Sequence, residues 1–124
     1  MTQKLDTFTR AYIECALWSS LDDDGEPLDR GYDASDLAPE TLARMVADCA
    51  DFQEKNRDLL DRYSGAEPNL SDDYAGHDFW LTRNHHGAGF WDRGLGELGE
   101  RLTEAALAYG ETDLYVGDDG KLYL

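Results

Sequence analysis

The sequence predicts an α+β fold in which three helices pack on a small antiparallel sheet made of two β-hairpins. Three segments repeat apolar residues at helical spacing, and two others place apolar residues on both sides of a glycine-containing turn. The chain has 124 residues and no internal repeat. We therefore expect a single domain over residues 1–124, because this length is close to the commonest domain size.

The first predicted helix runs from Asp6 or Thr7 to Ser20. Either residue can cap a helix N-terminus, because its side-chain oxygen accepts a hydrogen bond from a free backbone N–H. Apolar residues then recur on one broad face, and two more widen it; these are Phe8, Tyr12, Cys15, Ala16 and Trp18, with Ile13 and Leu17. A helix that is apolar nearly all round is expected at the centre of the fold.

Two further helices are predicted. One covers residues 39–63, because Pro39 suits the first helical position and an apolar stripe with heptad spacing follows it, interrupted at Asn56. Acidic side chains cluster on the opposite face of this helix. The other covers residues 94–109 and ends at Gly110, a residue that commonly terminates helices.

Two β-hairpins are predicted in the remaining segments. In GHDFWLTRNHHGAGFWDRG, Gly76–Gly94, two short strands with the pairs Phe79–Trp80 and Phe90–Trp91 flank a turn at residues 84–87. Side chains alternate faces along a strand, so one member of each pair is expected in the core and the other on the surface. The tail DLYVGDDGKLYL forms the second hairpin, around a turn at residues 117–120.

The cysteines and the N-terminus favour a cytoplasmic protein. Cys15 and Cys49 fall at apolar positions of helical patterns, so we expect buried free thiols rather than a disulfide. No apolar run reaches the roughly 18 residues that a membrane span requires. The N-terminal segment also lacks the basic and apolar regions of a signal peptide.

The charge of the chain is strongly negative and unevenly distributed. Twenty-seven acidic residues against eleven basic ones give −16, of which residues 22–40 contribute −7 and residues 64–82 contribute −4. Much of the excess therefore lies in predicted connecting segments, including a loop at residues 21–38 that is long enough to be mobile or functional. Direct binding to nucleic acid or an anionic membrane is disfavoured, because phosphates are bound by Lys and Arg. A basic partner surface is favoured instead.

The histidine-rich stretch raises the alternative of a metal site or a small enzyme. His77, Asp78 and His86 are weak candidates for metal ligands, since imidazole and carboxylate groups suit zinc or iron. Their spacing matches no metal motif, and the adjacent His85 and His86 point apart in a strand or turn. We therefore predict no metal or other cofactor, and a structural role for this stretch.

No catalytic residue is predicted, so the chain is not expected to be an enzyme. A GxSxG nucleophile motif is absent, and both cysteines are expected to be buried and therefore unactivated. The segment GAGF lacks the lysine of a P-loop and the strand–helix context of a dinucleotide site.

Several uncommon words of this sequence carry a family resemblance. These words extend over nearly the full chain; they are AYIECALWSS, EPLDRGYD, APETLARM, GHDFWLTRN, GAGFWDRG and LYVGDDGKLY. With them the chain resembles a family of small acidic proteins carried by tailed phages, prophages and some plasmids. His85 departs from that family, whose turn after Arg83 often is Asn-Gly-His-Gly. The resemblance implies a bacterial host cytoplasm and no established activity.

Together, resemblance and charge lead to the hypothesis of a stoichiometric inhibitor of a host protein. The expected partner is a basic nucleic-acid-binding protein or defence complex, and an anti-CRISPR or anti-restriction DNA mimic is one form of this hypothesis. The protein itself is expected as a monomer or homodimer. A phage structural or morphogenesis factor stays open as an alternative. The residues expected to bind the partner are the acidic ones of the two loops: Asp22, Asp23, Asp24, Glu26, Asp29, Asp33, Asp36, Glu67, Asp72 and Asp73.

Overall fold

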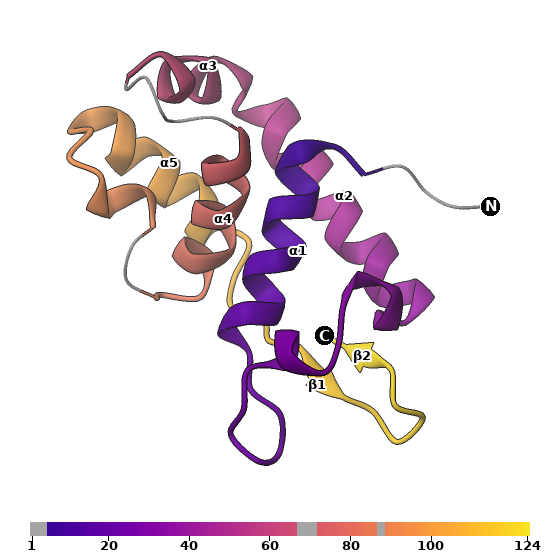
Figure 1. The fold of residues 1–124 in the computed structure, drawn as a ribbon. Coiled ribbons are helices and arrows are strands. Elements are labelled where there is room, and N and C mark those ends of the chain that lie inside the picture. The colour runs from indigo at the N-terminus through magenta and orange to yellow at the C-terminus, as the bar shows by residue number, and fades with distance from the viewer. Residues whose placement is uncertain (1–4, 67–71, 87–88) are drawn as a thin grey trace.

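The computed structural model describes residues 5–66, 72–86 and 89–124, and these residues form a mainly helical fold (Figure 1). The helices are α1 (Thr7–Ser19), α2 (Pro39–Lys55), α3 (Arg57–Ala66), α4 (Asp72–Arg83) and α5 (Glu97–Leu107). Short 3-10 turns are η1 (Leu28–Arg30), η2 (Ala34–Asp36) and η3 (Phe90–Asp92), and the sheet consists of β1 (Tyr115–Val116) and β2 (Leu122–Tyr123). The prediction of three helices on a sheet of two hairpins is therefore wrong.

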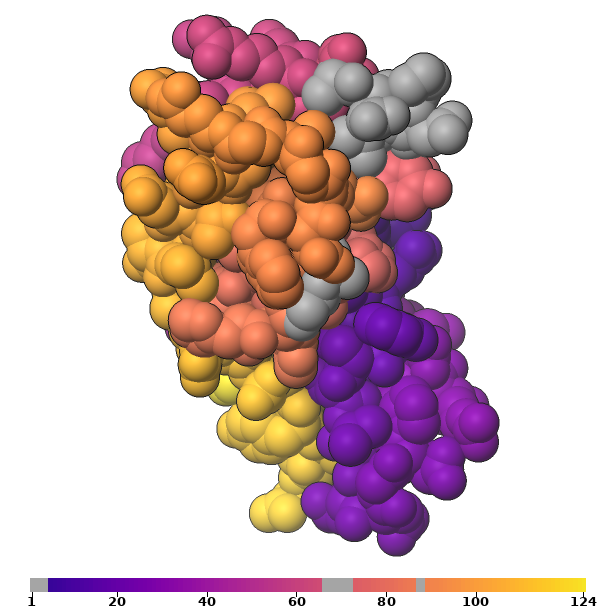
Figure 2. Space-filling model, turned by 90° about the vertical axis from the view of Figure 1, so that its left-hand side faces the viewer, coloured from indigo at the N-terminus to yellow at the C-terminus, as the bar shows by residue number. Residues whose placement is uncertain are grey.

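The helices are arranged around α1. This helix makes its most extensive contact with α4 and also packs on α2 and η1, while α5 packs on α4, α3 and η3. Helices α3 and α5 form one end of the molecule, and the sheet and the segment after α1 form the other (Figure 1 and Figure 2). Within the described ranges, none of the helices combines the length and the apolar character that crossing a membrane requires.

Two predicted helix starts are confirmed. Asp6 caps α1, since its carboxylate accepts a hydrogen bond of 2.8 Å from the backbone N–H of Thr9. Pro39 opens α2 as expected. The predicted helix 39–63, however, is divided at Asn56, whose backbone leaves the helical conformation and whose side-chain amide donates to a carbonyl oxygen of the preceding turn.

The main correction concerns residues 76–94, where the predicted hairpin is replaced by α4, a turn and η3. The hairpin was expected because of its paired aromatic residues, but Phe79 and Trp80 are both fully buried. Helix α4 packs against α1, α3 and α5, so nearly all of its second half is enclosed. A helix enclosed in this way has no polar face, and its periodicity therefore cannot distinguish it from a buried strand.

The C-terminal region follows the prediction more closely. Helix α5 covers most of the predicted helix 94–109, and the tail forms the predicted hairpin, with Tyr115 opposite Tyr123 and Val116 opposite Leu122. Leu122 is fully buried, and its carbonyl oxygen accepts a hydrogen bond of 3.0 Å from the backbone N–H at the start of α2. The hairpin thus joins the end of the chain to its second helix.

The contact between α1 and α4 depends on a glycine. A Cβ atom at Gly76 would lie 2.0 Å from the carbonyl oxygen of Phe8, so only a residue without a side chain permits this approach. Behind the contact lies an aromatic core in which the rings of Phe52 and Phe79 stack at 4.2 Å. Such ring pairs stabilise a small core beyond the burial of their area.

Arg83, at the end of α4, is a buried cation in this core. Its side chain is 2 % exposed and forms a salt bridge of 2.9 Å with Asp48 of α2. It donates further hydrogen bonds to the Tyr12 hydroxyl of α1 and to the carbonyl oxygens of Tyr109 and Gly110 after α5. A single guanidinium therefore joins four segments, and its buried charge is compensated by one carboxylate and three oxygen acceptors.

We expect Arg83→Met to lower the free energy of unfolding by about 2–4 kcal/mol, because it removes four hydrogen bonds made by a buried guanidinium and leaves the partly exposed Asp48 carboxylate unpaired. Urea denaturation followed by circular dichroism measures the change. Arg62→Met, at an exposed position of α3, is the matched control and should have little effect. A loss below about 1 kcal/mol for Arg83→Met would show that this network is not essential.

Candidate functional site

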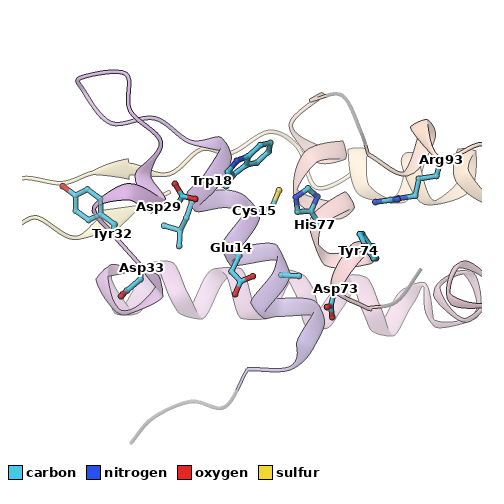
Figure 3. Close-up of a pocket in the computed structure, with 12 residues that line it drawn as sticks. Glu14, Cys15, Trp18, Asp29, Tyr32, Asp33, Asp73, Tyr74, His77 and Arg93 are labelled. Carbon is cyan, nitrogen blue, oxygen red and sulfur yellow. The ribbon is translucent and has the colours of Figure 1, made fainter. Parts of the chain in front are cut away.

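An open pocket of about 740 Å³ lies along the outer side of α1, a volume typical of ligand sites (Figure 3). Helix α1 contributes one strip of its lining, the segment from η1 to η2 a second, and α4 with the residue after η3 the rest. We call it the α1 groove; its lining residues are Ala11, Glu14, Cys15, Leu17, Trp18, Asp29, Tyr32, Asp33, Asp73, Tyr74, His77 and Arg93.

The groove brings together acidic residues from both predicted patches. Asp29 and Asp33 come from the first acidic loop. Asp73 was expected in the second acidic loop but lies in the first turn of α4, far from them in the sequence. Glu14 of α1 joins them. Sequence reasoning missed Glu14, because an isolated acid on a predicted core helix carries no signal until a neighbouring loop is placed beside it.

Five of the other predicted partner-binding residues lie outside the groove. Asp22, Asp23, Asp24, Glu26 and Asp36 do not line it. Glu67 lies outside the described residues, as does the side chain of Asp72, and neither can be placed.

Several acidic side chains of the first loop stabilise its backbone. Asp22 accepts hydrogen bonds of 2.9 and 3.0 Å from the backbone N–H groups of Asp24 and Glu26. Asp33 and Asp36 cap η2 reciprocally. The hydrogen bonds that Asp33 accepts from Ser35 hold the pKa of its carboxyl group below the usual value, so this groove carboxylate stays ionised. The acidic side chains therefore hold the loop backbone in a defined local conformation.

Aromatic side chains provide the apolar part of the groove. Trp18 is 56 % exposed and Tyr74 is 45 % exposed, while Tyr32 is half-buried. Trp18 was expected on the core face of its helix, and this is wrong. Its position on α1 is rotated away from the buried stripe, at the edge of the contact with α4. There its ring lies 6.0 Å from that of His77.

The one arginine of the groove is already paired. Arg93 donates from Nε and Nη2 to the carboxylate of Asp78, which is completely buried, and the Nη2 bond measures 2.9 Å. Tyr63 donates a hydrogen bond of 2.7 Å to the same carboxylate. Burial raises the pKa of Asp78, while the bonds from Arg93 and Tyr63 oppose that change. Arg93 therefore adds little net positive charge to the groove.

The structure does not gather the three candidate metal ligands. Asp78 is engaged by Arg93 and Tyr63, His86 is exposed beyond the end of α4, and His77 is half-buried against Trp18. Burial lowers the pKa of His77, which favours its neutral form. No group of three or more His, Cys, Asp or Glu side chains suited to a metal occurs in residues 5–66, 72–86 and 89–124.

The groove also lacks an activated nucleophile. Cys15 lines it but is 1 % exposed, and burial raises the pKa of its thiol to about 12. A thiol with that pKa is protonated at neutral pH, and the thiolate is the reactive species. The arrangement of carboxylates and exposed aromatic rings is suited to binding a cation rather than to covalent chemistry.

Comparisons with protein-family models, with curated proteins and with solved structures found no match for this chain. A function for this chain is therefore inferred from the geometry of the α1 groove.

Both cysteines are free and buried, as the sequence predicted, and burial raises the pKa of each thiol. We expect neither Cys15 nor Cys49 to react with a thiol reagent such as dithionitrobenzoate while the protein is folded, and both to react in denaturant. Absorbance at the released thionitrobenzoate band counts the thiols. Rapid labelling of the native protein would contradict the burial of Cys15 on α1 or of Cys49 on α2.

Proposed function

We propose that this chain is a binding protein that docks a basic segment of a protein partner in the α1 groove. In line with the resemblance to phage and prophage accessory proteins, the partner is a basic nucleic-acid-binding protein or defence complex of a bacterial host, which the chain inhibits stoichiometrically. For a partner whose basic surface normally holds phosphates, occupation of that surface by carboxylates would exclude the nucleic acid.

One observation carries this proposal: acids from three separate segments converge on a groove with exposed aromatic rings. Glu14, Asp29, Asp33 and Asp73 line it, whereas its one arginine is neutralised by Asp78. An acidic surface that served only solubility would not need an exposed tryptophan in its lining, and tryptophan is enriched among residues that dominate binding energy. Charge complementarity favours a basic occupant and fast association.

The experiment is a pull-down with tagged protein from host-type bacterial lysate, washed at low and then at high salt, with mass spectrometry of the bound proteins. The test variant carries Glu14→Gln, Asp29→Asn, Asp33→Asn and Asp73→Asn. Asparagine retains the capping ability of Asp33, so the loop should keep its shape. We expect a basic protein that is retained at low salt, released at high salt and bound about tenfold more weakly by the variant, since each rim ion pair contributes up to about 1 kcal/mol.

The matched control removes four negative charges elsewhere, by Glu40→Gln, Glu54→Gln, Asp58→Asn and Asp61→Asn on α2 and α3. It changes the net charge equally but leaves the groove intact. Equal weakening by both variants would mean that overall charge, and not the groove, attracts the partner. The absence of any salt-sensitive partner would favour a structural or morphogenesis role instead.

A further inference from the structure

We infer that the α1 groove recognises an arginine side chain of the partner segment, with the guanidinium plane lying on the indole of Trp18 and its N–H groups donating to carboxylates of the rim. This inference rests on the proposed function and deepens it by naming the chemistry that the groove selects. Arginine, rather than basic charge in general, is then the determinant of binding.

Trp18 is an exposed aromatic side chain of the groove. More than half of this side chain is open to solvent although it borders a pocket, and only His77 contacts its ring among the aromatic side chains of the described residues. Burial lowers the pKa of His77, so this neighbour is neutral and does not repel a cation on the indole. A tryptophan face is the best platform for a cation among the aromatic side chains.

The carboxylates of Glu14 and Asp29 line the same groove as Trp18. Glu14 precedes Trp18 by four residues on α1, so both side chains lie on the same face one helical turn apart. Asp29 of η1 lies beside this face, on the side of the groove opposite His77 (Figure 3). A cation placed on the indole would therefore share the groove with two carboxylates, which are the kind of acceptor that a guanidinium requires.

This combination distinguishes arginine from lysine. A guanidinium is planar, stacks on aromatic rings and presents donors in the plane of its edge, whereas an ammonium group is compact and more strongly hydrated. An exposed indole that shares its groove with Glu14 and Asp29 suits the first geometry. For lysine the groove would offer charge attraction without stacking.

The lined surface along α1 extends beyond the reach of a single arginine side chain, which favours an arginine within a longer segment. A second pocket of about 390 Å³, whose lining includes Arg10, shares Glu14, Leu17 and Asp33 with the α1 groove and therefore lies beside it on α1. A free guanidine or amino acid would leave most of this length empty. A peptide segment with one arginine at Trp18 would fill it.

The inference is tested with two short glycine-containing peptides that differ only in carrying three arginines or three lysines, titrated against the full chain by isothermal calorimetry at physiological salt. The arginine peptide is expected to bind about tenfold more tightly, the effect of roughly 1.4 kcal/mol from stacking. Trp18→Leu should abolish this preference and Trp18→Phe should retain part of it, since phenylalanine keeps an aromatic face. Trp91→Leu, at another exposed tryptophan outside the groove, should leave it unchanged.

The outcomes separate this inference from the proposed function. Equal binding of both peptides, lost on neutralising Glu14, Asp29, Asp33 and Asp73, would overturn the arginine preference and leave the groove as a general basic site. An arginine preference that survives Trp18→Leu in a folded variant would also overturn it. Binding of neither peptide, together with no salt-sensitive partner from lysate, would remove both proposals. Circular dichroism confirms that each variant is folded.

Discussion

The buried guanidinium of Arg83 is the contact on which the rest of the structure depends. It joins Tyr12 of α1, Asp48 of α2 and the carbonyl oxygens of Tyr109 and Gly110 beyond α5, so segments from the beginning, middle and end of the chain meet at one cation. Without it, the buried Tyr12 hydroxyl and the partly exposed Asp48 carboxylate would lose their shared charged partner. Because Arg83 ends α4, this network also fixes how α4 lies against α1, and the α1 groove forms along one border of that contact.

A second ion pair connects the same helix to the groove. Asp78 is buried within α4 and forms a salt bridge with Arg93. The positive charge of Arg93, which would repel a basic ligand, is therefore neutralised. The opposite wall is fixed by burial of Leu28 and Leu37 on either side of the acidic segment, and by a hydrogen bond of 2.9 Å from the Leu28 N–H to the carbonyl oxygen of Ser20. The backbone that carries the acidic residues of the groove is therefore held in place by buried leucines. Their burial offsets the repulsion between the neighbouring carboxylates.

Local rules predicted the ends of elements well and the burial of α4 poorly. The cap at Asp6, the start at Pro39 and the tail hairpin depend on side chains a few residues apart, which the sequence shows directly. At Asn56 the sequence indicated only an interrupted apolar stripe, and the end of α2 there was not predicted. The helical state of residues 72–83 depends instead on packing against α1, α3 and α5, which overrides the strand preference of aromatic residues.

The same division applies to the candidate site. The acidic segments were evident from composition, and three of the ten expected partner-binding residues, Asp29, Asp33 and Asp73, line the groove. Glu14 and Trp18 could not be assigned to it from the sequence. Their role depends on which face of α1 the neighbouring elements leave uncovered, and this is a tertiary property.

The central claim, that a basic segment occupies the α1 groove, is tested most directly by chemical-shift mapping on the isotope-labelled protein titrated with the three-arginine peptide. The account predicts that the largest shifts follow the groove, at Glu14, Trp18, Asp29, Asp33, Asp73 and Tyr74. Shifts concentrated on the acidic face of α2 and α3 or on the turn at residues 22–26, with the groove unperturbed, would contradict it.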